Sequence, residues 1–128
     1  MPTSKHRLAL LAAALTLAGA ARFAAAADCA LALGYAAAVV DSGQRAAASQ
    51  DYVQASNLAS NARLPAIDAA QQARACGCRE AVPFLAEAAN DAARVNVVFN
   101  LTAAQQYGTS IAKHGQAAVD ALRRCATR

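Results

Sequence analysis

Apolar and small residues recur at alternating steps of three and four along three stretches of this chain, the spacing of one face of an α-helix. The most regular stretch contains Leu101, Ala104, Gly108, Ile111, Gly115, Ala118, Leu122 and Cys125. A second contains Cys78, Ala81, Leu85, Ala88, Ala92, Val95 and Phe99, and a third contains Cys29, Leu33, Ala36, Val40, Gly43 and Ala47. No sustained alternation typical of a half-buried strand accompanies them. The pattern predicts an all-α protein in which these faces pack against one another.

Caps and breakers predict where the first helices begin and end. Asp28 suits the N-cap of a first helix that runs to about Arg63, with a kink or break at Asp41-Ser42-Gly43. Leu64-Pro65 predicts the next boundary, because proline is tolerated in a first helical turn but restricts the residue before it. A second helix should then run from Pro65 to about Cys76 and stop near Gly77.

The second half of the chain predicts two further helices. A third helix should start near Arg79, hold Pro83 in its first turn and reach Phe99. Asn100 or Thr102 should cap a last helix that continues to about Cys125. If the chain only bends around Gly77 and Pro83, the second and third helices merge. We therefore expect a small bundle of three or four helices.

The first 27 residues have the pattern of a cleavable signal peptide. A basic segment, Lys5 to Arg7, precedes an apolar run from Leu8 to Ala18, and the small residues Ala25-Ala26-Ala27 predict cleavage before Asp28. The run is shorter than the roughly 20 apolar residues that span a bilayer. We expect one helical domain, residues 28–128, exported by a bacterial secretory route to the periplasm or beyond and holding no stable membrane anchor after cleavage.

Two alternatives to simple cleavage depend on the same segment. A lipoprotein would carry its lipid on Cys29, but Asp28 immediately before it argues against lipid attachment. An uncleaved signal anchor is disfavoured because the apolar run is short.

Removing the leader changes the charge of the chain. The whole sequence has a net charge of +4, but Lys5, Arg7 and Arg22 precede residue 28, which leaves 9 basic and 8 acidic residues and a net charge of +1. The basic residues are dispersed, except for a C-terminal group formed by Arg123, Arg124 and Arg128. Since nucleic-acid binding needs a clustered basic face, we expect no nucleic-acid partner.

Composition predicts a thin core stapled by disulfides. The 101 residues after position 27 include 29 alanines but only 19 Leu, Ile, Val and Phe residues together. Small domains with little apolar area to bury often need staples, and an oxidising compartment allows cysteine to supply them. The four cysteines, Cys29, Cys76, Cys78 and Cys125, predict two disulfides.

Three connectivities are open to four cysteines. If Gly77 forms a turn, Cys76 and Cys78 lie at one junction, and one of them pairs with Cys29 while the other pairs with Cys125. A bond between Cys76 and Cys78 is less attractive because their loop is so tight.

The Cys76-Gly77-Cys78 motif also raises a chemical alternative. Cys78 lies near a predicted helix N-terminus and beside Arg79, an environment that favours a thiolate. The motif is not the redox signature Cys-x-x-Cys, so a structural bridge is favoured. A soft-metal site would combine Cys76, Cys78 and His114. His114 is distant in sequence and is better interpreted as a boundary residue, so we expect no bound metal and no cofactor.

No catalytic motif emerges from the polar residues. Glu80, Glu87 and Asp91 share one face of the third predicted helix, where paired carboxylates would suit acid and base catalysis. Arg94 lies three residues beyond Asp91, and we expect local charge pairing on a solvated face instead. The sequence therefore favours a protein that is not an enzyme.

Gly108 and Gly115 lie one heptad apart on the last predicted face and imply close helix approach. We favour packing within the chain over self-association through this pair. Taken together, these patterns favour an exported binding or structural module with a protein partner in the cell envelope. The alternative is a thiol-redox or soft-metal protein that uses Cys76-Gly77-Cys78.

Overall fold

The computed structural model describes residues 29–126 of the 128-residue chain, and this part is helical without a strand. The first helix covers residues 29–48, and α2 (Tyr52–Asn61), α3 (Arg63–Ala75), α4 (Val82–Arg94) and α5 (Leu101–Ala126) follow it. Two short 3-10 turns, η1 (Arg79–Ala81) and η2 (Val95–Val97), flank α4. The all-α prediction is confirmed for these residues. The predicted signal peptide, residues 1–27, lies outside the described part.

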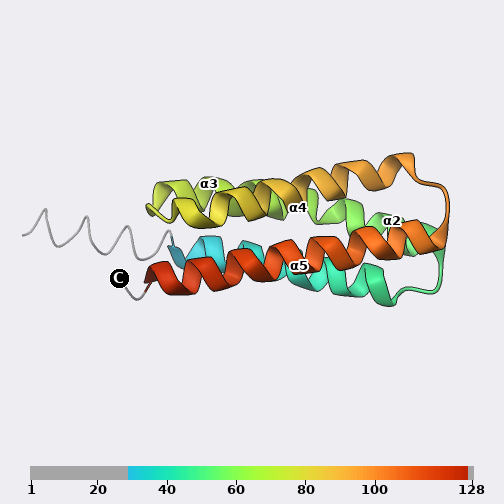
Figure 1. Ribbon diagram of the computed structural model, residues 1–128, viewed down its shortest axis with the longest axis horizontal. Helices are drawn as coiled ribbons and strands as arrows, with labels where there is room; N and C mark the ends of the chain where they lie inside the picture. Colours follow the sequence, from blue (N-terminus) through green and yellow to red (C-terminus); the bar gives the residue numbers. More distant parts are fainter. Residues whose placement is uncertain (1–28, 127–128) are drawn as a thin grey trace, which may run out of the picture.

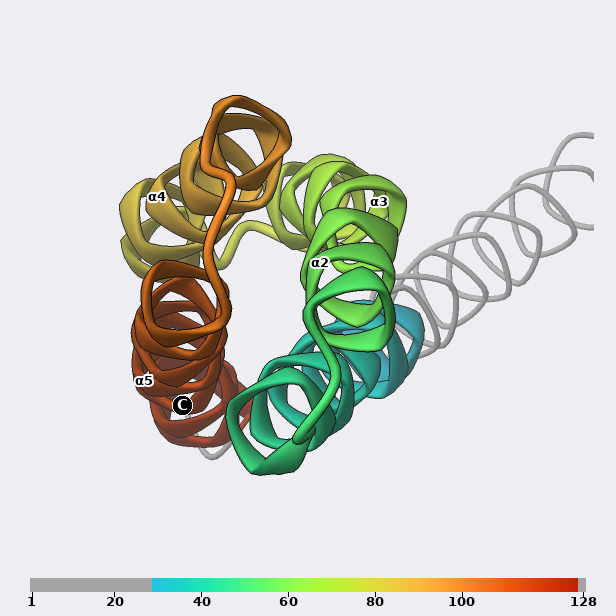
Figure 2. The same ribbon diagram turned by 90° about the vertical axis from the view of Figure 1, so that its right-hand side faces the viewer.

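Four helical rods form an up-and-down bundle. Only Ala62 separates α2 from α3, and its backbone stays in the α region (φ −71°, ψ −16°), so the two helices continue as one rod (Figure 1). Figure 2 shows the four rods around a common axis. The loops at 49–51 and 98–100 meet at one end of the bundle, which we call the loop end. No helix within residues 29–126 is long and apolar enough to cross a membrane.

The boundary of the first helix differs from the prediction. The helix passes through residues 41–43 without a break and ends at residue 48, far before Arg63. Asp51 caps α2, since its Oδ1 accepts a hydrogen bond from the Gln54 amide at 2.8 Å. The Ser49 hydroxyl contacts the Asp51 carbonyl and Gln54 Oε1, both at 3.2 Å. An Asp followed three residues later by Gln is a helix-start signal that the boundary prediction overlooked.

Gly43 is a packing contact between the first helix and α5, where the sequence predicted a kink or break. A Cβ added to Gly43 would lie 2.6 Å from the Ala112 nitrogen and 2.7 Å from the Gly108 oxygen. A Cβ on Gly115 would lie 3.0 Å from side-chain carbons of Val39 and Val40. The face that carries Gly108 and Gly115 is therefore covered by the first helix of the same chain.

The core consists mainly of alanine. The largest fully buried side chains are those of Leu85, Ile111, Leu122, Val39, Val95 and Cys78. The predicted face of α5 is confirmed from Ala104 to Leu122, and that of α4 is confirmed as far as Val95. Phe99 was expected to continue this face, but it is 84% exposed. The helical turns end at Val97 and the backbone of Val98 is extended (φ −103°, ψ 148°), so Phe99 leaves the helical register.

Candidate functional site

Local backbone structure places Cys76 and Cys78 on opposite sides of one turn. α3 ends in a Schellman motif, in which the Cys78 amide donates to the Ala73 carbonyl at 2.8 Å and the Gly77 amide donates to the Arg74 carbonyl at 3.2 Å. Gly77 has a φ of +80°, a conformation that glycine adopts readily because it lacks a Cβ. The turn sends the chain from α3 into η1. Its two cysteines consequently face different neighbours.

Each of these cysteines forms a disulfide with a cysteine near one end of the described chain. Cys76 pairs with Cys29 at the start of the first helix, and Cys78 pairs with Cys125 in the last turn of α5. The Cα–Cα distances are 5.3 Å and 5.8 Å, within the usual range for disulfides. The prediction of two disulfides is confirmed, and their connectivity ties both helical ends to the 76–78 turn.

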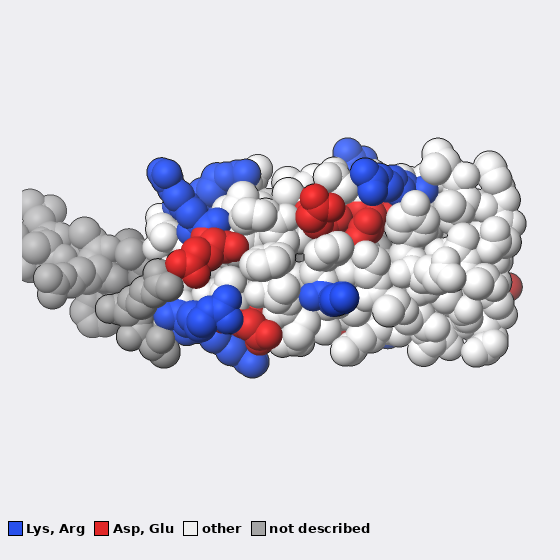
Figure 3. Space-filling model, in the orientation of Figure 1, with Lys and Arg blue, Asp and Glu red and all other residues white. Residues whose placement is uncertain are grey.

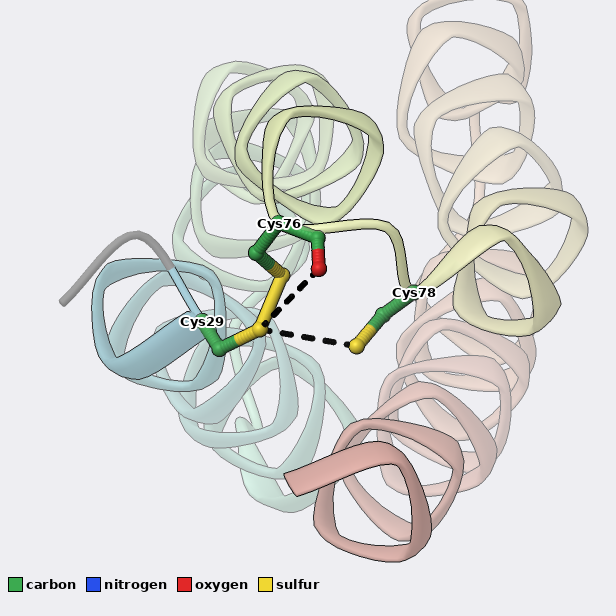
Figure 4. Close-up of side chains that lie close together, drawn as sticks. All are labelled: Cys29, Cys76 and Cys78. Carbon is green, nitrogen blue, oxygen red and sulfur yellow. Dashed lines mark hydrogen bonds between the residues drawn. A yellow bond between two sulfur atoms is a disulfide. The ribbon is translucent and has the colours of Figure 1, made fainter. Parts of the chain in front are cut away.

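The two disulfides touch each other at the cysteine cluster, by which we mean Cys29, Cys76, Cys78 and Cys125. Cys29 Sγ lies 3.5 Å from Cys78 Sγ and 3.7 Å from the Cys76 carbonyl oxygen (Figure 4). Disulfide sulfurs carry no hydrogen, so in the oxidised protein these are contacts, and they become hydrogen bonds only when a thiol is present. Cys78 is 2% exposed, whereas the other three cysteines are half-buried.

The sulfur atoms form a compact group that is not aligned for exchange. A thiolate attacks a disulfide sulfur opposite the leaving sulfur. If Cys78 Sγ lay on the extension of the Cys29–Cys76 bond, it would be about 5.5 Å from Cys76 Sγ. The sulfur atoms of Cys29, Cys76 and Cys78 instead all lie within 4.8 Å of one another. Attack of a Cys78 thiolate on Cys29 Sγ, with Cys76 as the leaving group, therefore requires a rearrangement of this cluster.

His114 lies far from Cys76 and Cys78, with which the sequence would combine it in a soft-metal site. His114 and Cys125 lie eleven positions apart on α5, which corresponds to about 16 Å along the helix axis. Cys29 occupies the place in the cluster that the hypothesis gave to His114. The combination of Cys76, Cys78 and His114 as ligands is therefore not brought together.

A separate polar cluster links α4 and α5 midway along the bundle. The Ser110 hydroxyl donates to Asp91 Oδ2 at 2.7 Å, and His114 Nδ1 lies 3.1 Å from the same oxygen. Since a carboxylate only accepts, Nδ1 carries the proton in this pair. Asp91 is 6% exposed, and both of its partners are half-buried.

The arrangement of Asp91, Ser110 and His114 does not activate the serine. In a hydrolytic triad the carboxylate holds one ring nitrogen and the serine hydroxyl bonds the other. Here the carboxylate and the hydroxyl both lie at Nδ1, with Ser110 Oγ 3.5 Å from that atom. The serine hydroxyl is bonded to the carboxylate instead of the second ring nitrogen, so the cluster lacks the triad arrangement and links α4 to α5.

The acidic residues on the third predicted helix do not all lie on the solvated face that the sequence predicted. Glu80 and Glu87 are exposed, but Asp91 is buried and faces α5. Its described partners are Ser110 and His114, where the sequence predicted pairing with Arg94. Ser110 was not predicted to join this cluster. Its position one turn before His114 on α5 is the signal that would have indicated it, because residues four apart share a helix face.

No protein-family model matches the chain, and no curated protein or solved structure matches it either.

Proposed function

We propose that the protein is an exported, non-catalytic binding module that contacts a protein partner in the cell envelope. The predicted leader at residues 1–27 and the two disulfides support a periplasmic or secreted location, since disulfides persist in oxidising compartments. The polar link at Asp91 and the compact cysteine cluster favour structural over catalytic roles. The proposal therefore rests on the surface of the bundle.

The observation that carries the proposal is a set of exposed apolar residues at the loop end. Val53 is 60% exposed, Val97 is 70% exposed and Phe99 is 84% exposed. A hydrogen bond from the Tyr52 hydroxyl to the Val98 carbonyl, 2.7 Å long, holds the segments of these three residues together. Exposed aromatic and aliphatic side chains that cluster at one place are typical of protein-binding surfaces.

Charged side chains lie mainly away from the exposed apolar residues of the loop end. On the face shown in Figure 3, charged side chains extend from the disulfide end to beyond the middle of the bundle, and only the loop end is almost free of them. The sequence has no Lys, Arg, Asp or Glu between Arg94 and Lys113. Apart from the exposed Asp51, binding at the loop end would thus require little desolvation of charge, and the disulfides at the opposite end would remain undisturbed.

The test compares two sets of exposed apolar residues. Purified protein should be cross-linked in the cell-envelope fraction of its source, as wild type, as a Val97→Ser/Phe99→Ser variant and as a Leu64→Ser variant. Leu64 is 70% exposed on α3 and serves as the matched control. We expect the wild type and the control to give the same cross-linked partner and the loop-end variant to lose it. Equal recovery with all three proteins would reject the loop end as the binding surface.

The competing proposal is a thiol-redox or soft-metal protein based on Cys76-Gly77-Cys78. It predicts that the oxidised protein accepts electrons from a dithiol substrate and passes them on catalytically. A dithiol-oxidation assay with multiple turnovers would favour this function over the binding module. A single stoichiometric reduction would be expected of structural disulfides.

A further inference from the structure

The cysteine cluster brings four sulfur atoms from separate parts of the chain to one end of the bundle. The sulfurs of Cys29, Cys76 and Cys78 lie within 4.8 Å of one another, and Cys125 is bonded to Cys78. We propose that, once both disulfides are reduced, these four cysteines bind one Zn²⁺-type cation as a tetrathiolate site. This inference is independent of the proposed binding function.

A dithiol reductant opens the two protein disulfides and so makes the four cysteines available to the metal. Two dithiol molecules supply four electrons and four protons, become disulfides themselves and leave the protein with four thiols. Binding of Zn²⁺ then forms four metal–sulfur bonds and releases four protons, because thiolates rather than thiols are the ligands. Two molecules of the oxidised dithiol would reverse the reaction: they take up four electrons and four protons, restore both protein disulfides and expel the cation, since a disulfide sulfur is not a thiolate.

Three of the four sulfur atoms already lie close enough to share one cation, and the fourth, Cys125 Sγ, is bonded to one of them. In a tetrahedral site with Zn–S bonds of about 2.3 Å, neighbouring sulfurs are about 3.8 Å apart. Cys29 Sγ and Cys78 Sγ are 3.5 Å apart in the oxidised protein (Figure 4). Within each disulfide the sulfurs need to separate by less than about 2 Å to reach the tetrahedral spacing. The compactness that misaligns the cluster for exchange is therefore what suits it to a single cation.

The surroundings suit an anionic metal centre. A tetrathiolate of a divalent cation has a net charge of −2, which the negative dipole ends of α3 and α5 at this end disfavour and nearby cations stabilise. Arg74 in the last turn of α3 and Arg123 in the last turn of α5 place cations there. The Lys and Arg side chains at the disulfide end of Figure 3 show this accumulation. Cys78, buried among alanines of the core, limits the access of water.

The experiment is an anaerobic titration of the fully reduced, full-length mature protein with Co²⁺, followed by displacement with Zn²⁺. We expect one equivalent of Co²⁺ to give the intense visible and near-ultraviolet absorption of tetrahedral cobalt thiolates. One equivalent of Zn²⁺ should abolish it. The oxidised protein should bind neither ion. A stoichiometry other than one, or octahedral Co²⁺ absorption, would overturn the proposal.

Variants identify the ligands. Loss of an outer-shell partner alone costs about 10- to 100-fold in metal affinity, so Cys→Ser at any of the four positions should cost at least about 100-fold. His114→Ala should leave the affinity unchanged. A full-strength site in Cys125→Ser would contradict the four-ligand proposal.

Circular dichroism separates metal binding from any unfolding that reduction causes. The metal-loaded reduced protein should show the helical content of the oxidised protein, whether or not the reduced metal-free chain is folded. Metal binding that leaves an unfolded spectrum unchanged would show adventitious thiol binding and would reject the site.

Discussion

Gly43 of the first helix and Gly108 of α5 meet backbone to backbone. A Cβ on Gly43 would lie 2.7 Å from the Gly108 carbonyl oxygen, and a Cβ on Gly108 would lie 2.8 Å from the Gly43 carbonyl oxygen. The obstructing atoms are main-chain atoms, which cannot move aside by changing a rotamer. An added methyl group therefore has to push one helix away from the other.

We expect Gly108→Ala to lower the free energy of unfolding by about 1 to 3 kcal/mol, the usual cost of overpacking a tight core. The matched control is Gly34→Ala, because Gly34 is helical and exposed and an added Cβ there meets nothing within 4 Å. This control should gain about 0.5 to 1 kcal/mol, since alanine restricts the unfolded chain more than glycine does. Urea denaturation measures both changes, and a gain for both variants would show that the contact is looser than described.

The two disulfides should stabilise the fold by similar amounts, because each lowers the conformational entropy of the unfolded chain. Each joins residues 47 positions apart, for which loop-closure entropy predicts about 4 kcal/mol at 25 °C. The paired variants Cys29→Ala/Cys76→Ala and Cys78→Ala/Cys125→Ala should each lose an amount of that order. The second pair should lose more, because Cys78 is buried and its truncation leaves a cavity. Chemical denaturation of the oxidised proteins checks this, and losses below about 1 kcal/mol would refute a clamping role.

Removal of the Asp91 carboxylate should destabilise the contact between α4 and α5. Asp91→Ala leaves the Ser110 hydroxyl and His114 Nδ1 without their acceptor, which should cost about 1 to 3 kcal/mol. Asp41→Ala is the control, since the Asp41 side chain is 67% exposed and its ion pair with Arg45 spans 3.9 Å. The control should stay within about 0.5 kcal/mol of wild type. Thermal unfolding separates the two outcomes, and equal shifts would mean that the buried link contributes nothing.

Gly77→Ala measures how much the positive φ at residue 77 costs in stability when the residue carries a Cβ. An added Cβ meets nothing within 4 Å, yet φ is +80°, so the whole cost comes from the left-handed conformation. We expect a loss of about 1 to 2 kcal/mol, measured by denaturation of the oxidised protein. Gly77→Asn should lose less, because asparagine tolerates this region better. An alanine variant as stable as wild type would argue that the turn relaxes into another conformation.

Periodicity predicted the α5 face from Ala104 to Leu122 because every residue of that face meets another helix. The turn that joins Cys76 to Cys78 could also be predicted from the sequence, since a glycine between the two cysteines indicates a turn. The helix boundary at Ser49 to Asp51 was missed because alanine propensity on both sides concealed a short capping signal. The sequence also presented Gly43 as a breaker, since propensity alone does not reveal a partner backbone on another helix.

The polar residues were harder to place. Asp91 fits a solvated charge stripe within its own helix, and only the packing of α5 against α4 shows that it is buried. The same limit applies to the cysteine cluster. Sequence spacing proposed which cysteines pair, but contact between the two disulfides depends on how three helix ends converge in space.

The connectivity divides the described chain into two covalently closed helical hairpins. One ring runs from Cys29 to Cys76, the other runs from Cys78 to Cys125, and Gly77 is the one residue between them. Each ring contains one loop of the loop end. A protease that cut at 49–51 or at 98–100 would release no fragment, because a disulfide bridges each cut. The exposed apolar loop end can therefore be nicked without separating the chain into pieces.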